Sequence, residues 1–368
     1  MKKLFAYSFF LLFTGLLLSA IKPVVTNDPV TGEDGPYLLY KNGQIFQGRI
    51  MGDSAGKKLQ LDSYSMDQKS KLVLQVGTDV PGIYFSVKLK EKLKNEKTEW
   101  KSPAKMFVLS DIEGNFRSFR TLLQANGVID SAFHWSFGEG HLVLSGDFVD
   151  RGTQVMEVLW LIYSLEDQAK AAGGYVHYVL GNHEIMNLDG DIRYVHGKYL
   201  EAASLLGEPY VNLLGENAEL GRWLRTKNII ERIGNMLFVH GGISEAINKM
   251  NTTAGLINDW SRPFYADSTF AFPSPQLDTI FGDMGPFWYR GYYLGQKATM
   301  GQVDSTLDKF NVKYIFTGHT IVADTITRFY NGKVFNTDLH HAKGFSEAVL
   351  KEGDRFYRVN LRGEKREL

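Results

Sequence analysis

In the second two thirds of the chain, short apolar runs alternate with longer segments whose apolar residues recur at helical spacing. Segments 116–125 and 154–172 have this helical spacing and separate the first apolar runs. The strand-like runs cover residues 106–110, 141–145, 175–180, 236–239 and 313–316. This alternation predicts βαβ units built on a parallel sheet that is buried on both faces. Residues 193–227 are predicted to be an amphipathic helical stretch, and residues 333–335 and 355–359 to form closing β-structure.

Between residues 28 and 100 the pattern differs, because short runs with strand character are separated by turn residues. Asn42 and Gly43 form a two-residue hairpin signal between the first two runs. The runs predicted as strands cover residues 38–40, 45–50, 72–76 and 83–87. Residues 88–101 are dense in lysine and glutamate, which predicts a solvated face or linker. We therefore expect a small β-rich module at 28–100, which either packs on the main domain or binds a partner, and a main domain at 103–368.

The first 22 residues have the charge pattern of an export signal. Lys2 and Lys3 precede the uncharged apolar run 4–20, and Lys22 ends it. Ala20 offers a small residue at the expected cleavage position. We expect an exported protein of the periplasm or cell envelope. The protein would be held at the membrane only if this segment is not cleaved, since the run is just long enough to span a bilayer.

Composition narrows the classes of function. The chain has 368 residues with 41 basic and 41 acidic side chains, so its formal net charge is zero. Bulk charge therefore gives no reason to expect nucleic acid or an anionic membrane surface as a partner. The chain contains no cysteine, which excludes a disulfide framework, a thiolate nucleophile and a thiolate metal site.

Polar residues follow each strong strand of the second region. The five loops are Asp111-Ile-Glu113-Gly-Asn115, Gly146-Asp147-Phe-Val-Asp150-Arg151-Gly152, Gly181-Asn182-His183-Glu184, His240-Gly-Gly242 and Gly318-His319-Thr320. In an open α/β sheet, ligands gather outside the carboxyl ends of the strands. We therefore expect these side chains to meet in one crevice.

The loop that contains Asp147 and Asp150 is the centre of this prediction. Two carboxylates so close repel each other, and a metal ion together with the guanidinium of Arg151 would relieve that repulsion. The structural alternative is a cap, in which Asp150 begins the helix that starts near Thr153. The oxygen and imidazole donors of the five loops suit a pair of divalent ions that share one carboxylate.

The ordered set of motifs resembles the calcineurin-like metallophosphoesterases. The forms Val149-Asp150-Arg151-Gly152 and Gly181-Asn182-His183-Glu184 resemble the phosphoprotein-phosphatase branch, and within it the bacterial Shewanella-like group. The resemblance covers about residues 106–350. It implies an α/β fold in which a four-layer β-sandwich is flanked by helices.

The resemblance also implies roles for single residues. Asp111, Glu113 and Asp147 would bind the first ion, and Asp147 would bridge to a second ion bound by Asn182, His240 and His319. Arg151 and Arg290, together with Asn182, would hold the phosphate group. His183, oriented by Asp150, would protonate the leaving oxygen. The alternative for Arg290 is a surface arginine stacked on Trp288 or Tyr289.

Glu113 departs from the family pattern, which has histidine at this position in most members. Two aspartates and one glutamate against two divalent ions leave a formal charge of about +1, where a histidine would leave about +2. The implied cofactors are two divalent ions (manganese, iron, magnesium or zinc), with manganese or iron favoured by the harder oxygen donor. The glutamate at position 113 has two other interpretations. The first ion could be trivalent, or the first metal site could be partly empty.

The resemblance implies an exported, metal-dependent phosphoric monoester hydrolase. Its substrates would be phosphoproteins, modified on serine, threonine or tyrosine, or small phosphomonoesters, and the nucleophile would be a hydroxide that bridges the metals. The alternatives are a phosphodiesterase or nucleotidase, and a non-catalytic protein that binds through the β-rich module. Two further assignments are left open. The aromatic segment 260–293 lines the cleft or belongs to the core, and His340 and His341 face the substrate or are ordinary loop residues.

Overall fold

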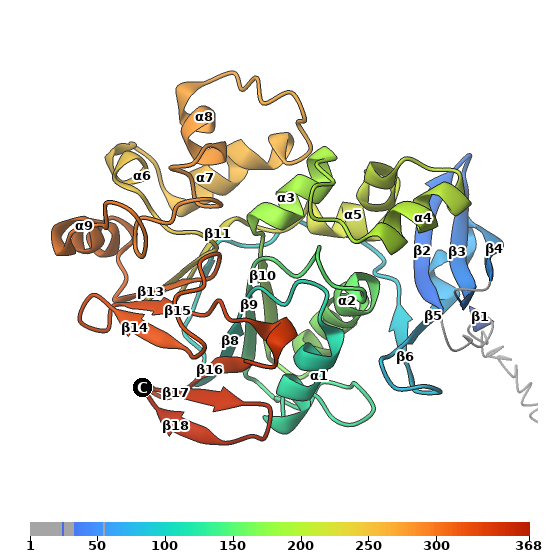
Figure 1. Cartoon of the computed structure of the whole chain (residues 1–368), viewed down its shortest axis with the longest axis horizontal. Coiled ribbons are helices and arrows are strands. Elements are labelled where there is room, and N and C mark those ends of the chain that lie inside the picture. Colours follow the sequence, from blue (N-terminus) through green and yellow to red (C-terminus); the bar gives the residue numbers. More distant parts are fainter. Residues whose placement is uncertain (1–23, 26–32, 54–55) are drawn as a thin grey trace, which may run out of the picture.

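The computed structural model describes residues 24–25, 33–53 and 56–368 (Figure 1). The predicted export segment at residues 1–22 lies outside the described residues. Among the helices that are described, none combines the length and the apolar character needed to cross a bilayer.

Two six-stranded sheets form the centre of the main domain. The first sheet has the order β10 (Tyr175–Val179), β9 (His141–Ser145), β8 (Lys105–Leu109), β16 (Glu347–Glu352), β17 (Arg355–Asn360) and β18 (Lys365–Glu367). The second has the order β14 (Thr327–Phe329), β15 (Val334–Asn336), β13 (Tyr314–Thr317), β12 (Met236–Val239), β11 (Ile230–Ile233) and β7 (Glu99–Trp100). Strands β8, β9 and β10 run parallel, as do β12, β13 and β15. The predicted mixed α/β fold is confirmed.

The alternation of side chains along the strands explains how the two sheets pack. Met106 and Val108 of β8 belong to an apolar cluster shared with Phe238 and Phe316 of the second sheet. Phe107, the residue between them, belongs to the cluster that includes the helices. Successive residues of a strand point to opposite faces, so each run of apolar residues fills the space between the sheets and the space under the helices.

Helices cover the outer faces of the sandwich. Helices α1 (Phe116–Ala125) and α2 (Val155–Ala171) occupy the predicted segments, and α3 (Asn182–Asp189) follows β10. The predicted helical stretch 193–227 is wrong as one stretch, since it is divided into α4 (Gly197–Leu206), a 3₁₀ helix (Tyr210–Leu214) and α5 (Glu219–Leu224). Gly207 ends α4 in the left-handed conformation, and Pro209 cannot continue it. The remaining helices are α6 (Glu245–Lys249), α7 (Ala254–Ser261), α8 (Pro275–Phe281) and α9 (Met300–Phe310).

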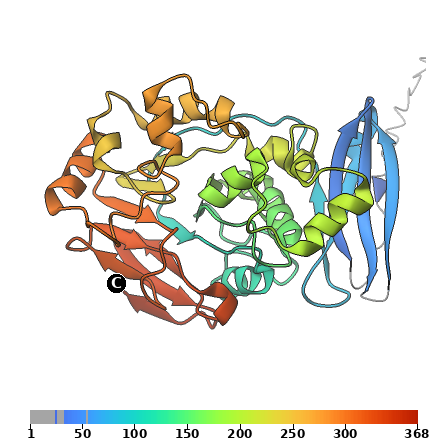
Figure 2. The same ribbon diagram turned by 45° about the horizontal axis from the view of Figure 1, so that its top comes forward.

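The amino-terminal module consists of two three-stranded sheets at one end of the molecule (Figure 2). One contains β2 (Asp34–Lys41), β3 (Gln44–Asp53) and β4 (Gly56–Ser65), and the other contains β1 (Val24–Val25), β5 (Leu72–Gly77) and β6 (Tyr84–Lys88). The sequence pattern did not predict β4. Its described side chains are exposed or half-buried along its whole length, so it carries no apolar stripe, and it is held by its backbone pairing with β3.

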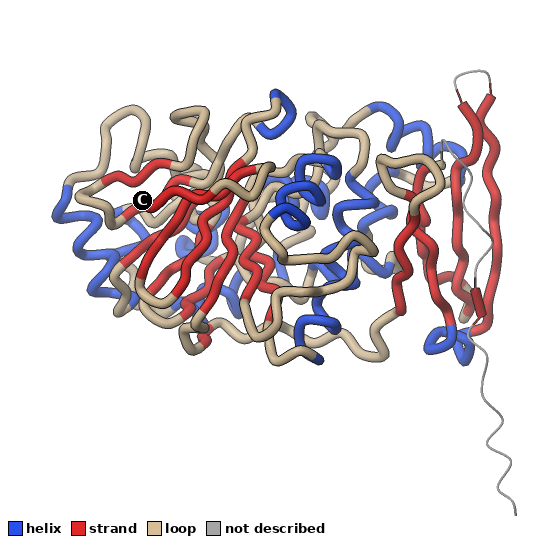
Figure 3. The backbone as a smooth tube through the Cα atoms, turned by 90° about the horizontal axis from the view of Figure 1, so that it is seen from below, coloured by secondary structure: helices blue, strands red, loops and turns tan. Residues whose placement is uncertain are grey.

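The module packs against the main domain. Trp160 of α2 donates its indole N–H to the carbonyl of Pro36 at 2.9 Å, and Lys69 forms an ion pair with Glu219 at 3.1 Å. Buried residues of β2, β5 and β6 belong to the same apolar cluster as those of α2. Figure 3 shows the strands of the module at one end and the central strands at the other, with helices between them. Of the two roles expected for this module, packing is the one that these contacts support.

Most lysines and glutamates of residues 88–101 are exposed, as a solvated face or linker would have them, but Lys90 and Glu96 are not. Lys90 is only 8% exposed, and its ammonium lies 2.9 Å from Asp167. Glu96 is paired with the buried Lys227 at 2.9 Å, and β7 adds a strand to the second sheet through its pairing with β11. The sequence pattern did not single out Lys90 and Glu96 because their partners lie far away in the sequence.

Candidate active site

Five loops meet at the carboxyl edge of the two sheets, as the sequence predicts. Asp111 follows β8, and its carboxylate accepts the backbone N–H of His319, which follows β13, at 3.1 Å. Asp147 follows β9, and its Oδ2 lies 3.0 Å from Nε2 of His240, which follows β12. The backbone N–H of His183, at the start of α3, donates to Asp147 Oδ1 at 3.0 Å. The structure therefore brings residues from all five loops together around Asp147.

The backbone of these loops is strained. Six of the predicted site residues have positive φ angles in the left-handed region: Asp111 (54°), Glu113 (48°), Asp147 (61°), Asp150 (68°), Arg151 (54°) and His319 (65°). Such conformations are costly for residues other than glycine and are retained where the surroundings fix them, often at functional sites. The strain directs the side chains of consecutive loop residues toward one point.

Two glycines permit the close approach of the loops. A Cβ on Gly181 would lie 2.1 Å from Asp147 Oδ1, and one on Gly318 would lie 2.2 Å from Asp111 Oδ2. Both distances are well below contact distance, so any side chain at these positions would displace a predicted metal ligand.

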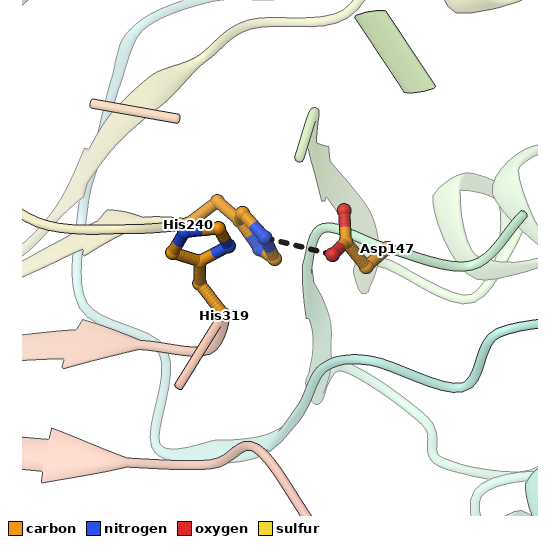
Figure 4. A group of neighbouring side chains, drawn as sticks. All are labelled: Asp147, His240 and His319. Carbon is orange, nitrogen blue, oxygen red and sulfur yellow. Dashed lines mark ion pairs between the residues drawn. The ribbon is translucent and has the colours of Figure 1, made fainter. Parts of the chain in front are cut away.

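Asp147 belongs to two groups of donors that could hold metal ions. Its carboxylate and the rings of His240 and His319 place ligand atoms within 4.8 Å of one another (Figure 4). A second group joins Asp147 with Glu113 and His183. A carboxylate common to two groups is what a bridging ligand requires, and the oxygen and imidazole donors fit divalent ions. The donor set is therefore suited to the metal ions that the family uses.

The other two predicted ligands border these groups. Asn182 Oδ1 accepts a hydrogen bond from His240 Nε2 at 3.0 Å, which places the amide oxygen beside the first group. The carboxylate of Asp111 accepts the N–H of His319 but lies outside both groups of closest donors. Its role as a ligand of the first ion stays a prediction.

Asp150 holds His183 and does not cap a helix. Its Oδ2 lies 2.6 Å from His183 Nδ1, and its Oδ1 accepts the side-chain N–H of Asn187 at 2.8 Å. Helix α2 begins after Gln154, whose side chain makes no capping hydrogen bond. The capping alternative for Asp150 is therefore wrong. The geometry agrees with an imidazole whose orientation and tautomer are fixed by a carboxylate.

Neighbouring opposite charges favour the charged forms of His240, Asp147 and His183 despite the burial of these groups. Burial opposes charge on His240, but Asp147 and Asp111 raise the pKa of His240 to about 10. Burial also acts against charge on Asp147, yet His240 and His183 hold the pKa of Asp147 below its ordinary value. The pKa of His183 is raised by Asp147 and Asp150, against the effect of burial. For Asp111 burial prevails and, with repulsion from Asp147, raises the pKa to about 7.

Arg151 and Glu113, predicted as a phosphate-binding arginine and a metal ligand, form an ion pair with each other. The Arg151 side chain is 48% exposed, and its guanidinium lies over the ring of Tyr194 at 5.2 Å from the centroid. Its charge is therefore close to the solvent-facing side of the cluster.

Arg290 lies beside the loop that carries His319. Its guanidinium donates to the carbonyl of His319 and to Thr320 Oγ1, the latter at 3.1 Å. Within the described part of the chain it has no cation–π contact with Trp288 or Tyr289, so these contacts give no support to the stacking alternative. The position beside the His319 loop is compatible with the predicted role in phosphate binding.

Two residues of the site were not identified from the sequence. Glu184 is buried, and its carboxylate accepts the backbone N–H groups of Asp147 (2.9 Å), Phe148 (2.8 Å) and Gly181 (2.7 Å) and the hydroxyl of Tyr178 (2.9 Å). It thereby ties two ligand-bearing loops together, and its place in the Gly181–Glu184 motif was the available signal. Tyr194 contacts both the ring of His183, at 5.0 Å between centroids, and Arg151. No pattern in the sequence marks it.

Most of the aromatic segment 260–293 belongs to the core. Tyr265, Phe287 and Tyr292 are buried, whereas Phe270 is exposed. Trp288 is the member that borders the site, with its ring 5.8 Å from that of His319. The prediction that most of this segment belongs to the hydrophobic core is confirmed.

His341 is a buried structural residue. Its Nδ1 lies 2.9 Å from Ser346 Oγ and its Nε2 lies 3.1 Å from the carbonyl oxygen of Ser110, so both ring nitrogens are engaged. For His341 the loop alternative is therefore the one that the structure supports. His340, next to it, is half-buried.

Comparisons with known proteins show the family to which the chain belongs. Residues 104–323 match the family model described as calcineurin-like phosphoesterase. The crystal structure of the cold-active protein-tyrosine phosphatase of a psychrophilic Shewanella species is 36% identical with a TM-score of 0.82, covering 92% of this chain and 100% of that one. Shewanella-like protein phosphatase 2 of Arabidopsis thaliana is 25% identical and covers 74% of this chain and 81% of that protein. Shewanella-like protein phosphatase 1 of Plasmodium berghei is 26% identical, over 63% of this chain and 66% of that protein.

Proposed function

Since the chain belongs to the calcineurin-like phosphoesterase family and is a phosphatase of the Shewanella-like class, we propose that it hydrolyses phosphomonoesters and that its physiological substrates are phosphoproteins. The observation that carries the proposal is the pair formed by His183 and Asp150, 2.6 Å apart beside the metal-binding groups of Asp147. A monoester of serine, threonine or tyrosine has a poor leaving group, which a positioned acid must protonate.

Each side chain has one task in this proposal. Two bound divalent ions would supply the charge that binds the phosphate group and activates the attacking water. His183 donates its Nδ1–H to Asp150, and its protonated form also carries the transferable proton on Nε2, which lies 3.8 Å from Asp147 Oδ2. Asp147 and Asp150 favour this protonated form because they raise the pKa of His183. Arg151, which is paired with Glu113, and Arg290, which lies beside the His319 loop, would neutralise the remaining phosphate oxygens.

A protein substrate is supported by the surroundings of the site. A cavity of about 840 Å³ adjoins Glu113 and Arg151 and includes Arg117 and Arg120 in its lining. The structural relative is named a protein-tyrosine phosphatase and the two sequence relatives are named protein phosphatases. An open hollow with basic side chains next to the reacting phosphate would accommodate the residues that flank a phosphorylated side chain.

The test compares substrate classes on the purified protein with manganese, iron, magnesium or zinc added in turn. Phosphopeptides containing phosphoserine, phosphothreonine or phosphotyrosine should be hydrolysed with higher kcat/KM than an aryl phosphodiester or a nucleotide. Asp147→Asn should be inactive on all of them, which would exclude a contaminating phosphatase. Higher kcat/KM on the diester or the nucleotide would replace the proposal with the phosphodiesterase or nucleotidase function.

We propose that manganese or iron is the native metal at the first ion. The support is the carboxylate of Glu113, a harder donor than the histidine found there in most of the family. Metal analysis of protein isolated without added metals should find manganese or iron. Zinc alone at full occupancy would refute this assignment.

We also propose that the chain is exported, on the charge pattern of residues 1–22. The full chain with a carboxyl-terminal tag should fractionate with the periplasm or envelope, and its mature amino terminus should follow Ala20. Leu11→Arg together with Leu12→Arg interrupts the apolar run and should retain the protein in the cytoplasm. An unchanged distribution of this double variant would refute export by this segment.

A further inference from the structure

A sixth loop reaches the carboxyl edge where the metal-binding groups lie. Strand β15 runs parallel to β13, with Phe335 opposite Phe316 and Asn336 opposite Thr317. The loop that follows β15 therefore leaves the sheet on the same side as the loop that carries His319. Asp338 is in this loop, two residues after the end of β15.

Hydrogen bonds fix the sixth loop between two of the ligand-bearing loops. The hydroxyl of Thr337 lies 2.8 Å from that of Ser110, the residue before Asp111. The backbone N–H of Thr337 donates to the carbonyl of Thr317 at 2.8 Å, and the Asn336 side chain donates to the carbonyl of Thr320 at 2.8 Å. Asp338 is thus held beside the loops of Asp111 and His319 by its own neighbours in sequence.

The carboxylate of Asp338 is buried among charged groups of the site. It is 5% exposed, and within the described ranges it has no hydrogen bond or ion pair. The groups that act on it electrostatically are Asp111, His240, Asp147 and Arg151, with Asp111 the strongest of these charged neighbours. A carboxylate in a mostly buried residue that receives no hydrogen bond from the protein needs compensation from water or from a cation.

Glu184 shows what a structural carboxylate in the same site looks like. Its two oxygens accept hydrogen bonds from the backbone N–H groups of Asp147, Phe148 and Gly181 and from the hydroxyl of Tyr178. Asp338 is buried to a similar degree without any of these donors. The difference separates a carboxylate whose hydrogen bonds hold loops in place from one that is free to bind a cation.

We propose that Asp338 is an additional ligand of the first metal ion, the ion that Asp111 is predicted to bind. The proposal rests on the dinuclear metal site of the proposed function. With Asp111, Glu113, Asp147 and Asp338 ionised, four negative charges balance two divalent ions, where three carboxylates leave about +1. The additional carboxylate makes the first ion site richer in oxygen, and so favours manganese or iron over zinc.

The test measures metal binding directly, without turnover. Metal-free full-length protein is titrated with Mn²⁺ by calorimetry, and bound Mn²⁺ is followed by electron paramagnetic resonance. Wild type should bind two Mn²⁺ ions, and Asp338→Asn, which keeps the size of the side chain, should bind one of them at least about tenfold more weakly. Asp308→Asn removes a carboxylate from the exposed surface of α9 and should bind Mn²⁺ as wild type does.

Thermal unfolding separates this role from a structural one. Without metal, Asp338→Asn should raise Tm, because it removes a buried charge near Asp111 and Asp147, whereas the rise of Tm on adding Mn²⁺ should be smaller than in wild type. A merely structural residue would lower Tm in both conditions. If Asp338→Asn does not fold, Asp338→Ser undergoes the same measurements.

Unchanged Mn²⁺ affinity and stoichiometry in a folded Asp338 variant would overturn the proposal, as would a lower Tm without metal and an unaltered response to Mn²⁺. Binding of only one Mn²⁺ ion by wild type, with no effect of Asp338→Asn, would overturn it as well. Failure of the proposed function gives a different result. In that case wild type binds two ions and Asp338→Asn weakens one of them, but phosphomonoesters are not hydrolysed.

Discussion

Two clusters of histidine and carboxylate occupy different parts of the same sheets, and all of their members except the half-buried His141 are buried. At the carboxyl edge, His183 and His240 contact Asp147 and Asp150. The second cluster begins at His141, the first residue of β9. Its Nδ1 lies 2.9 Å from Nε2 of His177 in β10, whose Nδ1 lies 2.8 Å from Glu231 in β11. We call this second group, His141, His177 and Glu231, the inter-sheet chain.

The two clusters differ in protonation although their residue types are the same. Burial lowers the pKa of His177 to about 3 and that of His141 to about 4, and it raises the pKa of Glu231 well above its ordinary value. At the active site the neighbouring carboxylates overcome burial and raise the pKa of His240 to about 10. His240 has the carboxylates of both Asp147 and Asp111 as neighbours, whereas the inter-sheet chain contains a single carboxylate.

The two clusters also differ in their hydrogen bonds and in their backbone conformation. Glu231 also accepts the side-chain N–H of Asn228 at 2.9 Å, and the ring of Trp100 packs edge-on against His177 at 5.1 Å between centroids. Both histidines lie in regular strands, whereas the loops of the active site have positive φ angles. Hydrogen bonds that are satisfied on an unstrained backbone indicate a structural cluster. Several charged side chains on a strained backbone indicate a site that binds a metal ion or a substrate.

The largest expected effect follows from removing Asp147. Asp147→Asn should lower kcat by about 10³-fold or more, because the shared metal ligand supplies several kcal/mol of transition-state stabilisation. Steady-state rates on an aryl phosphomonoester at saturating Mn²⁺ measure the loss. Glu231→Gln is the matched control in the inter-sheet chain and should keep kcat in the folded protein. A similar loss of kcat in both variants would remove the distinction between the clusters.

A smaller and selective effect is expected at His183. His183→Ala should lower kcat by about 10²-fold on alkyl phosphomonoesters, whose leaving groups need a proton, and by much less on activated aryl esters. Asp150→Asn should show the same selectivity, because Asp150 orients the ring. The measurement is the dependence of kcat on the leaving-group pKa for each variant. Equal losses across the series would contradict the assignment of the general acid.

The convergence of the five loops could be predicted from the sequence because their polar residues follow strands. The loops after β8, β9, β10, β12 and β13 each carry their polar residues within a few positions of a strong apolar run, so their convergence could be inferred from topology. Asp338 escaped assignment because β15 is a run of three residues and its loop lacks the family motif.

The inter-sheet chain could not have been predicted in the same way. His141 and His177 are single polar residues within strand patterns, and nothing local indicates that they touch. Their contact depends on the pairing of β9 with β10 and on the packing of the first sheet against the second, to which Glu231 belongs. The same limit applies to residues 88–101, whose charged side chains find buried partners near residues 166 and 227.

Breaking the inter-sheet chain should affect stability and not catalysis. Glu231→Ala leaves the buried N–H groups of His177 and Asn228 without their acceptor, so the free energy of unfolding should fall by about 1–3 kcal/mol. Urea unfolding followed by circular dichroism measures this change. Asp308→Asn on the surface should change the free energy by no more than about 0.5 kcal/mol. A loss of kcat in folded Glu231→Ala without any loss of stability would show that the chain serves catalysis.

The smallest expected effect is the pH dependence of stability. The folded-state pKa of His141 is about 4, below its ordinary value of 6.5, so between these values the unfolded chain binds more protons than the folded one. Acidification through this window therefore favours unfolding, and the contribution of His141 is fully present only above about pH 6.5. Glu231, with its raised pKa, acts in the opposite direction and reduces the net slope.

The variant His141→Gln tests this contribution. Its residue 141 cannot titrate, so its Tm should fall by a few degrees less than that of wild type between pH 7 and pH 5. The metal-free active site gives the opposite sign, because the raised pKa of His240 contributes stability that is lost as the pH rises toward 10. An acid slope in His141→Gln that equals that of wild type would show that this histidine is not held neutral by burial, and the contrast between the two clusters would then rest on geometry alone.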